Sequence, residues 1–337
     1  MNAQEKNVAT HGGVDDSVLP FAVEGLDVRG RVVRLGHAID MILARHAYPP
    51  AVARVVGEAA ALTALLGSAL KFTGQFQLQT RSDGPIEMIV VDFDAPDRLR
   101  AYARFDAERV HAAEAAGDLS TGTLLGRGHL ALTVDQGADM ARYQGIVALE
   151  GGDFEDVAHT YFQQSEQIPT RVRLAVGEEI MGVGDARRMG YRAGGLLVQF
   201  LPQAAGNVAD ALQDQGINVD ENGAEEASAD DRWQEAHLLV DTVEDHELID
   251  STVSSERLLF RLFHERGVRV FDTQPVHEAC RCDQERILTM LKSFDDDDRQ
   301  HMVGDDGRIG VTCEFCSRHY DINPVDVGVN VEKGNEL

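Results

Sequence analysis

The chain has 337 residues, of which 43% are hydrophobic and 26% charged, a composition typical of a folded globular protein rather than a fibrous or disordered one. Its 57 acidic residues outnumber its 31 basic residues, and the formal net charge is -26. This excess of negative charge argues against a protein whose main task is to bind nucleic acid phosphates. The length favours two domains, or one domain with appendages.

Residues 1–20 are polar and show no periodicity, so we expect a flexible extension there. They lack the basic start and apolar core of a signal peptide, and we therefore expect a cytoplasmic protein. The most hydrophobic stretch, residues 51–70, is long enough to span a membrane, but Arg54 and Glu58 would be costly inside a bilayer. We predict a buried core helix there and no membrane partner.

Residues 21–204 carry the mixed periodicities of an α+β core domain. A helix is predicted from Leu35, and Pro50 is suited to open the helix that follows, where its missing N–H costs little. A further helix begins after the capping residue Asp153. Segments that alternate with period two predict strands at 76–80, 86–93, 99–105, 129–134, 144–149, 171–176 and 195–201. We expect a largely antiparallel sheet with packed helices.

The composition changes sharply after Pro202. Residues 205–337 hold 31 acidic and 12 basic side chains, whereas residues 1–204 hold 26 and 19. The acidic stretch 213–231 has little to bury and predicts a solvated linker. Two amphipathic helices follow, with apolar faces formed by Trp233, Ala236, Val240 and Val243, and by Leu258, Leu259, Leu262 and Phe263. Two such helices cannot bury these faces alone, so we assign 205–271 to an acidic and helical linker that docks on the core sheet.

All four cysteines lie in one short window near the C-terminus. They form two close pairs, Cys280 with Cys282 and Cys313 with Cys316. Two such pairs can converge on one tetrahedral Zn²⁺ ion, although the single residue inside the first pair makes a tighter loop than the common two-residue gap. Reducing compartments favour metal ligation or a redox role over structural disulfides. We therefore predict one four-cysteine zinc site.

The predicted zinc domain covers residues 272–324, with a helix at 283–294 and a solvated acidic loop at 295–298, and residues 325–337 form a tail. The spacing alone leaves two roles open for the metal. In the first, zinc only holds together a module of about 50 residues that is too small to fold alone, as in most closed four-cysteine sites. In the second, the thiolates are poised for oxidation, and loss of zinc unfolds the module.

Segments along most of the chain resemble the redox-regulated 33 kDa chaperonin family, also called heat shock protein 33. The resemblance rests on the two cysteine pairs and the thirty residues between them. It also rests on residues 143–150, 161–162, 165–170, 194–199, 258–265 and 268–271. It runs in the same order from about Val28 to Ile322, and departs from the family at the N-terminal extension, the acidic insertion 218–231 and the tail after Asn323.

The resemblance implies a chaperone that binds unfolding proteins without ATP, a holdase rather than an enzyme. It implies an inactive reduced state with one Zn²⁺ held by all four cysteines. Oxidation would then form the disulfides Cys280–Cys282 and Cys313–Cys316, release the zinc, and unfold the C-terminal module and the linker. The implied partners are unfolded or aggregation-prone client proteins and, after oxidation, a second copy of the chain. The sequence does not identify the client-binding surface.

Two other functions stay open on the residues alone. One is an interaction module with purely structural zinc, for which the acidity disfavours a nucleic acid partner. The other is an enzyme with a site in the core domain, although no H-E-x-x-H, G-x-S-x-G or P-loop pattern is present. The stretch 182–185 begins like a dinucleotide fingerprint, but Arg187 stands at its third glycine, so we predict a loop. His237, His246 and His264 are interpreted as solvated or packed helical residues.

Overall fold

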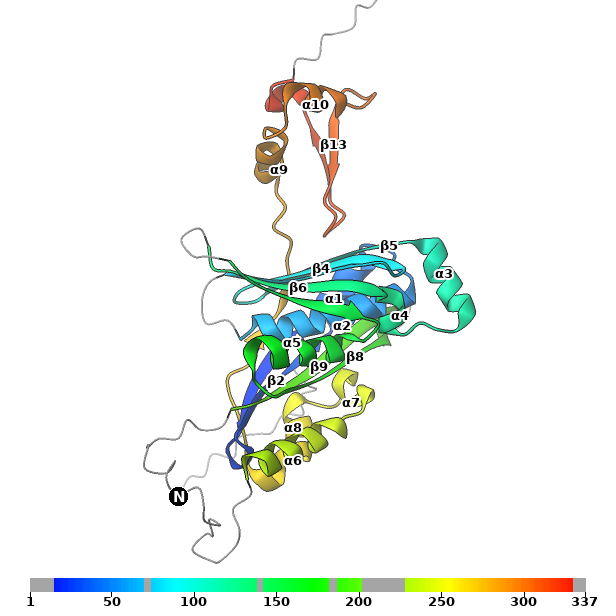
Figure 1. Ribbon diagram of the computed structural model, residues 1–337. Helices are drawn as coiled ribbons and strands as arrows, with labels where there is room; N and C mark the ends of the chain where they lie inside the picture. Colours follow the sequence, from blue (N-terminus) through cyan, green and yellow to red (C-terminus); the bar gives the residue numbers. More distant parts are fainter. Residues whose placement is uncertain (1–14, 70–73, 138–141, 182–186, 202–227, 330–337) are drawn as a thin grey trace, which may run out of the picture. The chain divides into compact units, whose positions relative to one another are not determined.

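The computed structural model describes residues 15–69, 74–137, 142–181, 187–201 and 228–329. The chain divides into two compact units (Figure 1). The larger unit comprises Met1–Ala44 and Tyr48–Glu278, and the smaller comprises Arg45–Ala47 and Ala279–Leu337. The helices that we predicted within the linker 205–271 therefore belong to the same unit as the core domain. Residues 205–227 of that linker, and the stretch 182–185, lie outside the described residues.

Two six-stranded sheets form the larger unit. Their strands are β1 (Ser17–Val23), β2 (Val28–Leu35), β3 (Gln75–Ser82), β4 (Ile86–Asp94), β5 (Arg98–Phe105), β6 (Arg127–Asp135), β7 (Tyr143–Glu150), β8 (Thr170–Met181), β9 (Arg188–Phe200), β10 (Val268–Val270), β11 (Gln274–Pro275) and β12 (His277–Glu278). The first sheet has the order β10-β1-β2-β9-β8, with β11 also beside β1, and the second has the order β12-β5-β4-β3-β6-β7. In the described part of the chain only β12 and β5 pair in parallel. The predicted α+β class with antiparallel pairing is confirmed, with two sheets in place of one.

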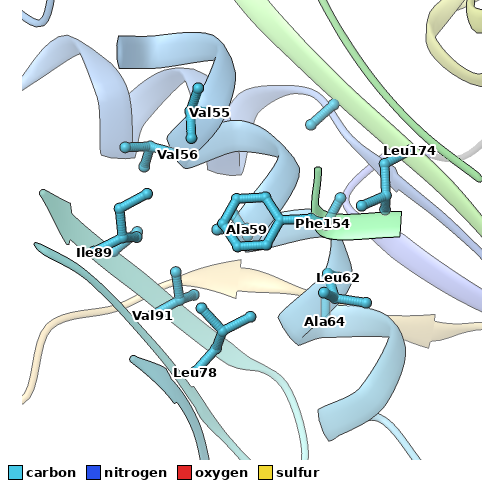
Figure 2. Close-up of a cluster of buried hydrophobic side chains, with 14 of the residues drawn as sticks. Val55, Val56, Ala59, Leu62, Ala64, Leu78, Ile89, Val91, Phe154 and Leu174 are labelled. Atoms are coloured by element: carbon cyan, nitrogen blue, oxygen red, sulfur yellow. The ribbon is translucent and has the colours of Figure 1, made fainter. Parts of the chain in front are cut away.

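Helices fill the space between the sheets and cover their faces. Those of the larger unit are α1 (His37–Ala44), α2 (Pro50–Gly67), α3 (Ala107–Ala116), α4 (Thr121–Leu125), α5 (Phe154–Tyr161), α6 (Ala229–Asp241), α7 (Asp245–Ile249) and α8 (Ser255–Phe263). Helix α2 presents Ala59 and Leu62 to a cluster that includes Ile89 of β4 and Leu174 of β8 (Figure 2). It therefore bridges the two sheets, with Pro50 at its first turn as predicted.

Helix α2 confirms the predicted buried core helix. Within the described residues it is the one helix long and apolar enough to cross a membrane, with 18 residues and a mean hydropathy of 1.3. However, 78% of this stretch is buried inside the protein. The apolar length of α2 is thus used to pack against both sheets. Its two charged residues, Arg54 and Glu58, form an ion pair with each other at 2.6 Å.

The structure moves several predicted boundaries. Strand β1 begins at Ser17, inside the predicted extension 1–20, because Val18 and Phe21 are buried in the sheet. Strand β2 continues to Leu35, so helix α1 starts at His37 instead. Strand β2 was missed because its sequence VRGRVVRL places three arginines among its apolar residues, and alternation becomes visible only if Arg34, 1% exposed, is counted as buried.

The smaller unit is a module with its own small core. It contains α9 (Gln284–Leu291), α10 (Asp296–His301), the hairpin β13 (Ile309–Thr312) and β14 (His319–Ile322), and a final 3-10 helix (Pro324–Val327). The core consists of Ile287, Leu291, Ile309, Ile322, Val327 and Val329. The last two residues of this core lie in the segment 325–337 that we predicted to be a tail, so that segment contributes to the module.

The acidic stretch 295–298 is not the loop that we predicted. Asp295 accepts a hydrogen bond from the backbone N–H of Asp298 and caps helix α10. The aspartates that follow lie in its first turn, where negative charge interacts favourably with the helix dipole. A run of acidic residues that looks solvated in sequence therefore begins a short helix.

Candidate metal centre and the docked linker helices

The chain brings all four cysteines together in the smaller unit. Cys280 and Cys282 lie in the extended stretch before α9, and Cys313 and Cys316 lie in the turn that joins β13 to β14. This turn is held by two backbone hydrogen bonds, from Ser317 N–H to the Cys313 carbonyl at 2.8 Å and from Cys313 N–H to the Arg318 carbonyl at 2.9 Å. The two-residue gap inside the second pair thus folds as a tight turn that directs both sulfurs to one side.

The four Sγ atoms all lie within 4.8 Å of one another. The Cys280 and Cys313 sulfurs are 3.6 Å apart, and the Cys282 and Cys316 sulfurs are 3.2 Å apart. These separations are too long for disulfide bonds, which measure about 2.05 Å. Four sulfurs at about 2.3 Å from one central Zn²⁺ ion would be separated by about 3.8 Å, close to the arrangement found. The donor set and its spacing therefore fit a tetrahedral metal ion.

The surroundings of the sulfurs also bear on ligation. The Tyr320 hydroxyl lies 3.3 Å from the Cys282 sulfur and donates to the Cys282 carbonyl at 3.2 Å. Burial, followed by contact with the Cys282 thiol, raises the pKa of Cys316 to about 12. Clustered thiols of this kind ionise when a metal cation displaces their protons. The histidines that we set aside lie elsewhere: His237 and His246 pair with helix acids, and His264 contacts the Phe260 carbonyl.

Helices α6, α7 and α8, which we call the linker helices, cover one face of the first sheet (Figure 1). Their buried apolar residues are Ala236, Val240, Val243, Leu248, Leu258, Leu259, Leu262 and Phe263. The sheet residues beneath them, which we call the docking face, are Leu19, Phe21, Val32, Leu196 and Val198. The prediction that the two amphipathic helices dock on the core sheet is confirmed. The sequence did not reveal α7, whose five residues are too few to show periodicity.

Phe263 stabilises this docking through aromatic packing. Its ring is fully buried and stacks on Phe21 with the centroids 5.8 Å apart. We expect Phe263→Ala to weaken the docking of α8 by about 3–5 kcal/mol, because it leaves a cavity as well as removing contacts. Hydrogen exchange of α8 amides measures this change. Phe260→Ala, on the same helix but 62% exposed, is the matched control, and equal effects of the two variants would contradict the assignment.

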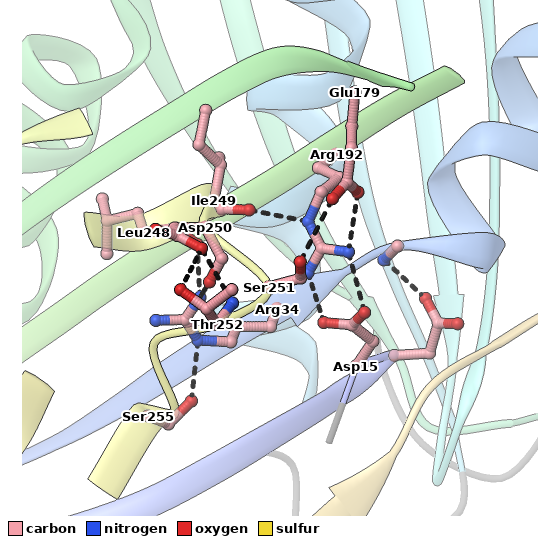
Figure 3. A network of polar contacts seen from close by, with 12 residues as sticks. Asp15, Arg34, Glu179, Arg192, Leu248, Ile249, Asp250, Ser251, Thr252 and Ser255 are labelled. Carbon is pink, nitrogen blue, oxygen red and sulfur yellow. Dashed lines mark hydrogen bonds and ion pairs between the residues drawn. The ribbon is translucent and has the colours of Figure 1, made fainter. Parts of the chain in front are cut away.

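Two buried arginines hold the turn between α7 and α8 (Figure 3). Arg34 of β2 donates to the carbonyls of Glu247 at 2.7 Å, Leu248 at 3.2 Å and Asp250 at 3.0 Å, and to the Ser255 hydroxyl at 3.2 Å. These carbonyls belong to the C-terminal turn of α7, which has no other intrahelical donors and carries the negative end of the helix dipole. The guanidinium therefore caps α7 and fixes it to the sheet.

Arg192 of β9 provides the second anchor. It donates to the Ile249 carbonyl at 2.6 Å and pairs with Asp15 and, at 3.2 Å, with Glu179. Ser251 also donates to Glu179 at 3.1 Å. Strand β9, the N-terminal segment at Asp15 and the turn between α7 and α8 thus meet in one polar network. We call the contacts of Arg34 and Arg192 with the turn between α7 and α8 the arginine latch.

Glu155 links helix α5 to strand β8 and makes stability depend on pH. It accepts the Leu174 N–H at 2.7 Å and lies 3.9 Å from Arg173, with Asp153 and Arg171 also nearby. Burial raises the pKa of Glu155 to about 7 from the ordinary 4.5, against the lowering effect of its hydrogen bond and of the arginines. The folded state then holds this proton more tightly than the unfolded state. The contribution of Glu155 to the free energy of unfolding is therefore fully present below pH 4.5 and is lost as pH rises through 7.

We therefore expect unmodified protein to lose up to about 3 kcal/mol of unfolding free energy from this group between pH 4.5 and 8. Glu155→Gln removes the titration and should flatten that part of the profile. Urea unfolding at a series of pH values measures the free energy of unfolding of the unmodified protein and of Glu155→Gln, both reduced and metal-loaded. Parallel profiles for both proteins would show that Glu155 does not titrate in this range.

The comparisons with known proteins agree with this architecture. Residues 16–323 match the sequence pattern of the Hsp33 protein family. The chain is 46% identical to the 33 kDa chaperonin of Caulobacter vibrioides over 93% of its own length and 96% of the relative. It is 36% identical to the 33 kDa chaperonin of Pseudomonas aeruginosa, with 91% of each chain covered. The crystal structure of the 33 kDa chaperonin from Thermotoga maritima matches with a TM-score of 0.69 at 19% identity, covering 93% of this chain and 96% of that one.

The fold and the cysteine cluster define an α+β protein with a C-terminal module whose four clustered cysteines could bind a metal ion. Together with the matches over nearly the whole length, they show that the chain belongs to the Hsp33 family of 33 kDa chaperonins. The chain is therefore a chaperone rather than an enzyme, and client proteins are its binding partners. The four-cysteine cluster is consistent with a redox switch.

Proposed function

We propose that this protein is an ATP-independent holdase of the cytoplasm that oxidation switches on. In the reduced state, Cys280, Cys282, Cys313 and Cys316 hold one Zn²⁺ ion, and the protein does not bind clients. The observation that carries the proposal is the convergence of all four sulfurs within 4.8 Å in a module whose apolar core, in the part that the structure describes, has six buried residues. So small a core depends on the metal for its folding free energy.

Oxidation removes the metal ligands. Each pair of thiolates gives up two electrons to an oxidant such as hypochlorite or peroxide and forms one S–S bond, and a disulfide sulfur no longer retains Zn²⁺. We assign the disulfides to Cys280–Cys282 and Cys313–Cys316, following the family resemblance. In the reduced fold the sulfurs of opposite pairs are also close, at 3.6 Å for Cys280 and Cys313 and 3.2 Å for Cys282 and Cys316. Bonds across the pairs would keep the two halves of the module tied together, whereas bonds within each pair leave them free to separate.

Unfolding of the module would then loosen the linker helices. Between Phe263 and Cys280 the chain is attached to the sheets by β10, β11 and β12, which contribute only three, two and two paired residues. Such short strands provide little resistance once the module has unfolded. Release of α8 and its neighbours uncovers the docking face, an apolar surface of the kind that binds unfolding chains. We assign client binding to this face, and the same face provides an apolar surface for a homodimer of oxidised chains.

One experiment tests the switch. Zinc release and the suppression of aggregation of a thermally unfolding client are followed in the same sample before and after oxidant. We expect no suppression in the reduced zinc-loaded protein, and suppression that rises in step with zinc release. Zinc release without suppression would refute the holdase assignment. Zinc retained under oxidant, with no change in suppression, would favour a purely structural metal.

A further inference from the structure

A second feature of the larger unit has no role in the redox switch. A cavity of about 270 Å³ lies where the end of α2 meets both sheets. Its apolar lining includes Leu65, Leu66, Phe76, Val134, Phe162 and Leu197. Its polar lining includes Tyr143, Tyr161 and Gln199, which come from three separate core segments that carry the family resemblance. These segments lie far from the cysteines in sequence and contribute no residue to the four-cysteine cluster.

Arg31 lies in this cavity with its charge uncompensated. It is half-buried on β2, and its Nε atom is buried without a hydrogen-bond partner. In the described part of the chain no carboxylate lies within ion-pair distance of Arg31. Arg173 and Arg232 also have a buried Nε without a partner, but each of them makes an ion pair. An unpaired guanidinium against an apolar wall is costly, and its burial together with the nearby Arg29 lowers the pKa of Arg31.

Glu166 also lines the cavity. Glu166 accepts the Tyr161 hydroxyl at 3.0 Å, within a π-helical turn (Phe162–Glu166) that follows α5. The Tyr161 ring is packed so closely over Gly145 of β7 that a Cβ there would lie 2.4 Å from the ring. Backbone and side-chain packing therefore fix this wall of the cavity, and the buried Nε of Arg31 is left without a hydrogen-bond partner. Turns of this π type occur frequently at functional sites.

We propose that this cavity binds a small apolar carboxylate, with the Arg31 guanidinium pairing with the carboxylate and the apolar wall enclosing a short aliphatic body. A planar guanidinium matches a carboxylate with two parallel hydrogen bonds. At about 30 Å³ for each non-hydrogen atom, the volume admits about nine atoms, roughly the size of a carboxylic acid of seven or eight carbons. A free aliphatic acid and the C-terminal residue of a client chain both present this chemistry.

The test uses the full-length reduced, zinc-loaded protein and octanoate as the probe, with binding measured by titration calorimetry. We expect saturable binding, and at least about a tenfold weaker affinity in Arg31→Met, which keeps the side-chain length and removes the charge. Arg29→Met, an exposed arginine on the same strand, should bind octanoate as the unmodified protein does. Octan-1-ol, which lacks the charge, should not distinguish Arg31→Met from the unmodified protein. Equal octanoate affinity in both proteins, or no binding to either, would overturn the assignment.

A second variant gives an independent test if Arg31→Met does not fold. Leu197→Phe fills the cavity without touching the charge, and it should also abolish octanoate binding while the far-UV circular dichroism is unchanged. Retained binding in this variant would place the ligand elsewhere and refute the proposal. A short peptide ending in leucine, with a free or an amidated C-terminus, then identifies the source of the carboxylate. Competition with octanoate by the free acid alone supports a client chain end, and no competition supports a free acid. Octanoate binding is measured without oxidant. A negative result would therefore refute the cavity proposal and leave the proposed redox switch unaffected.

Discussion

Cys282→Ser is expected to release zinc without any oxidant. Apparent binding free energies of structural zinc sites are about 10–16 kcal/mol, so losing one of four thiolates removes roughly 3 kcal/mol and weakens zinc binding by about a hundredfold or more. The remaining sulfurs form a poorer cage, and Tyr320 loses its sulfur contact. Because the six-residue core of the module depends on the metal, we expect loss of the β13–β14 hairpin as well. Competition with a chromogenic chelator measures the zinc affinity, and hydrogen exchange measures the hairpin.

The matched control for this variant is Glu314→Gln. Glu314 is exposed and lies inside the Cys313–Cys316 turn, but it carries no sulfur. We expect it to retain zinc nearly as the unmodified protein does. If Cys282→Ser holds zinc as tightly as Glu314→Gln, the four-thiolate site is wrong. If it loses zinc and its module stays folded, the metal does not provide the folding free energy of the module, and the proposed switch fails at its first step.

Arg34→Met is expected to release the linker helices while the metal site stays intact. The substitution removes four hydrogen bonds from a side chain that is 1% exposed. The carbonyls of Glu247 and Leu248 lose their Arg34 donor, whereas the Asp250 carbonyl keeps its hydrogen bond from the Val253 N–H. Two buried carbonyls that lose a charged donor cost about 3 kcal/mol together. Since the docking face lies beneath these helices, we expect the reduced variant to suppress client aggregation without oxidant, with its zinc retained.

Limited proteolysis in the linker helices and client aggregation assays check this result together. Arg257→Met, at an exposed position of α8, is the control and should remain inactive when reduced. If the Arg34→Met helices detach and the protein stays inactive, the docking face is not the client-binding surface. If the helices stay docked, the arginine latch contributes little, and apolar packing around Phe263 holds them alone.

The two variants separate two free energies that the proposed switch must overcome. One is the metal-dependent folding of the small unit, and the other is the docking of the linker helices through the apolar cluster and the arginine latch. In the proposed switch, loss of zinc removes the first of these and acts on the second through the short strands β10 to β12. Conditions that weaken the docking of the helices, such as heating, should therefore add to the effect of oxidant.

The sequence by itself determined the elements whose chemistry is local. The cysteine pairs, the helix with Pro50 in its first turn, the alternating strands of the second sheet and the apolar faces of α6 and α8 can all be recognised from residue type and spacing. The same holds for the docking of the helices, because an apolar face without a partner must be buried somewhere. These features depend on residues near one another in the chain.

Only the tertiary structure decided the features in which distant residues meet. Arg34 is an ordinary charged residue in sequence and becomes the cap of a helix more than 200 positions away. Arg31, three residues earlier, faces the opposite side of the same strand and lines a cavity assembled from several distant segments. A buried arginine breaks the alternation of polar and apolar residues by which strands are recognised. The sequence pattern therefore did not predict strand β2 or the arginine latch. The reason is physical: burial and pairing are set by what packs against a side chain, and that depends on how the whole chain folds.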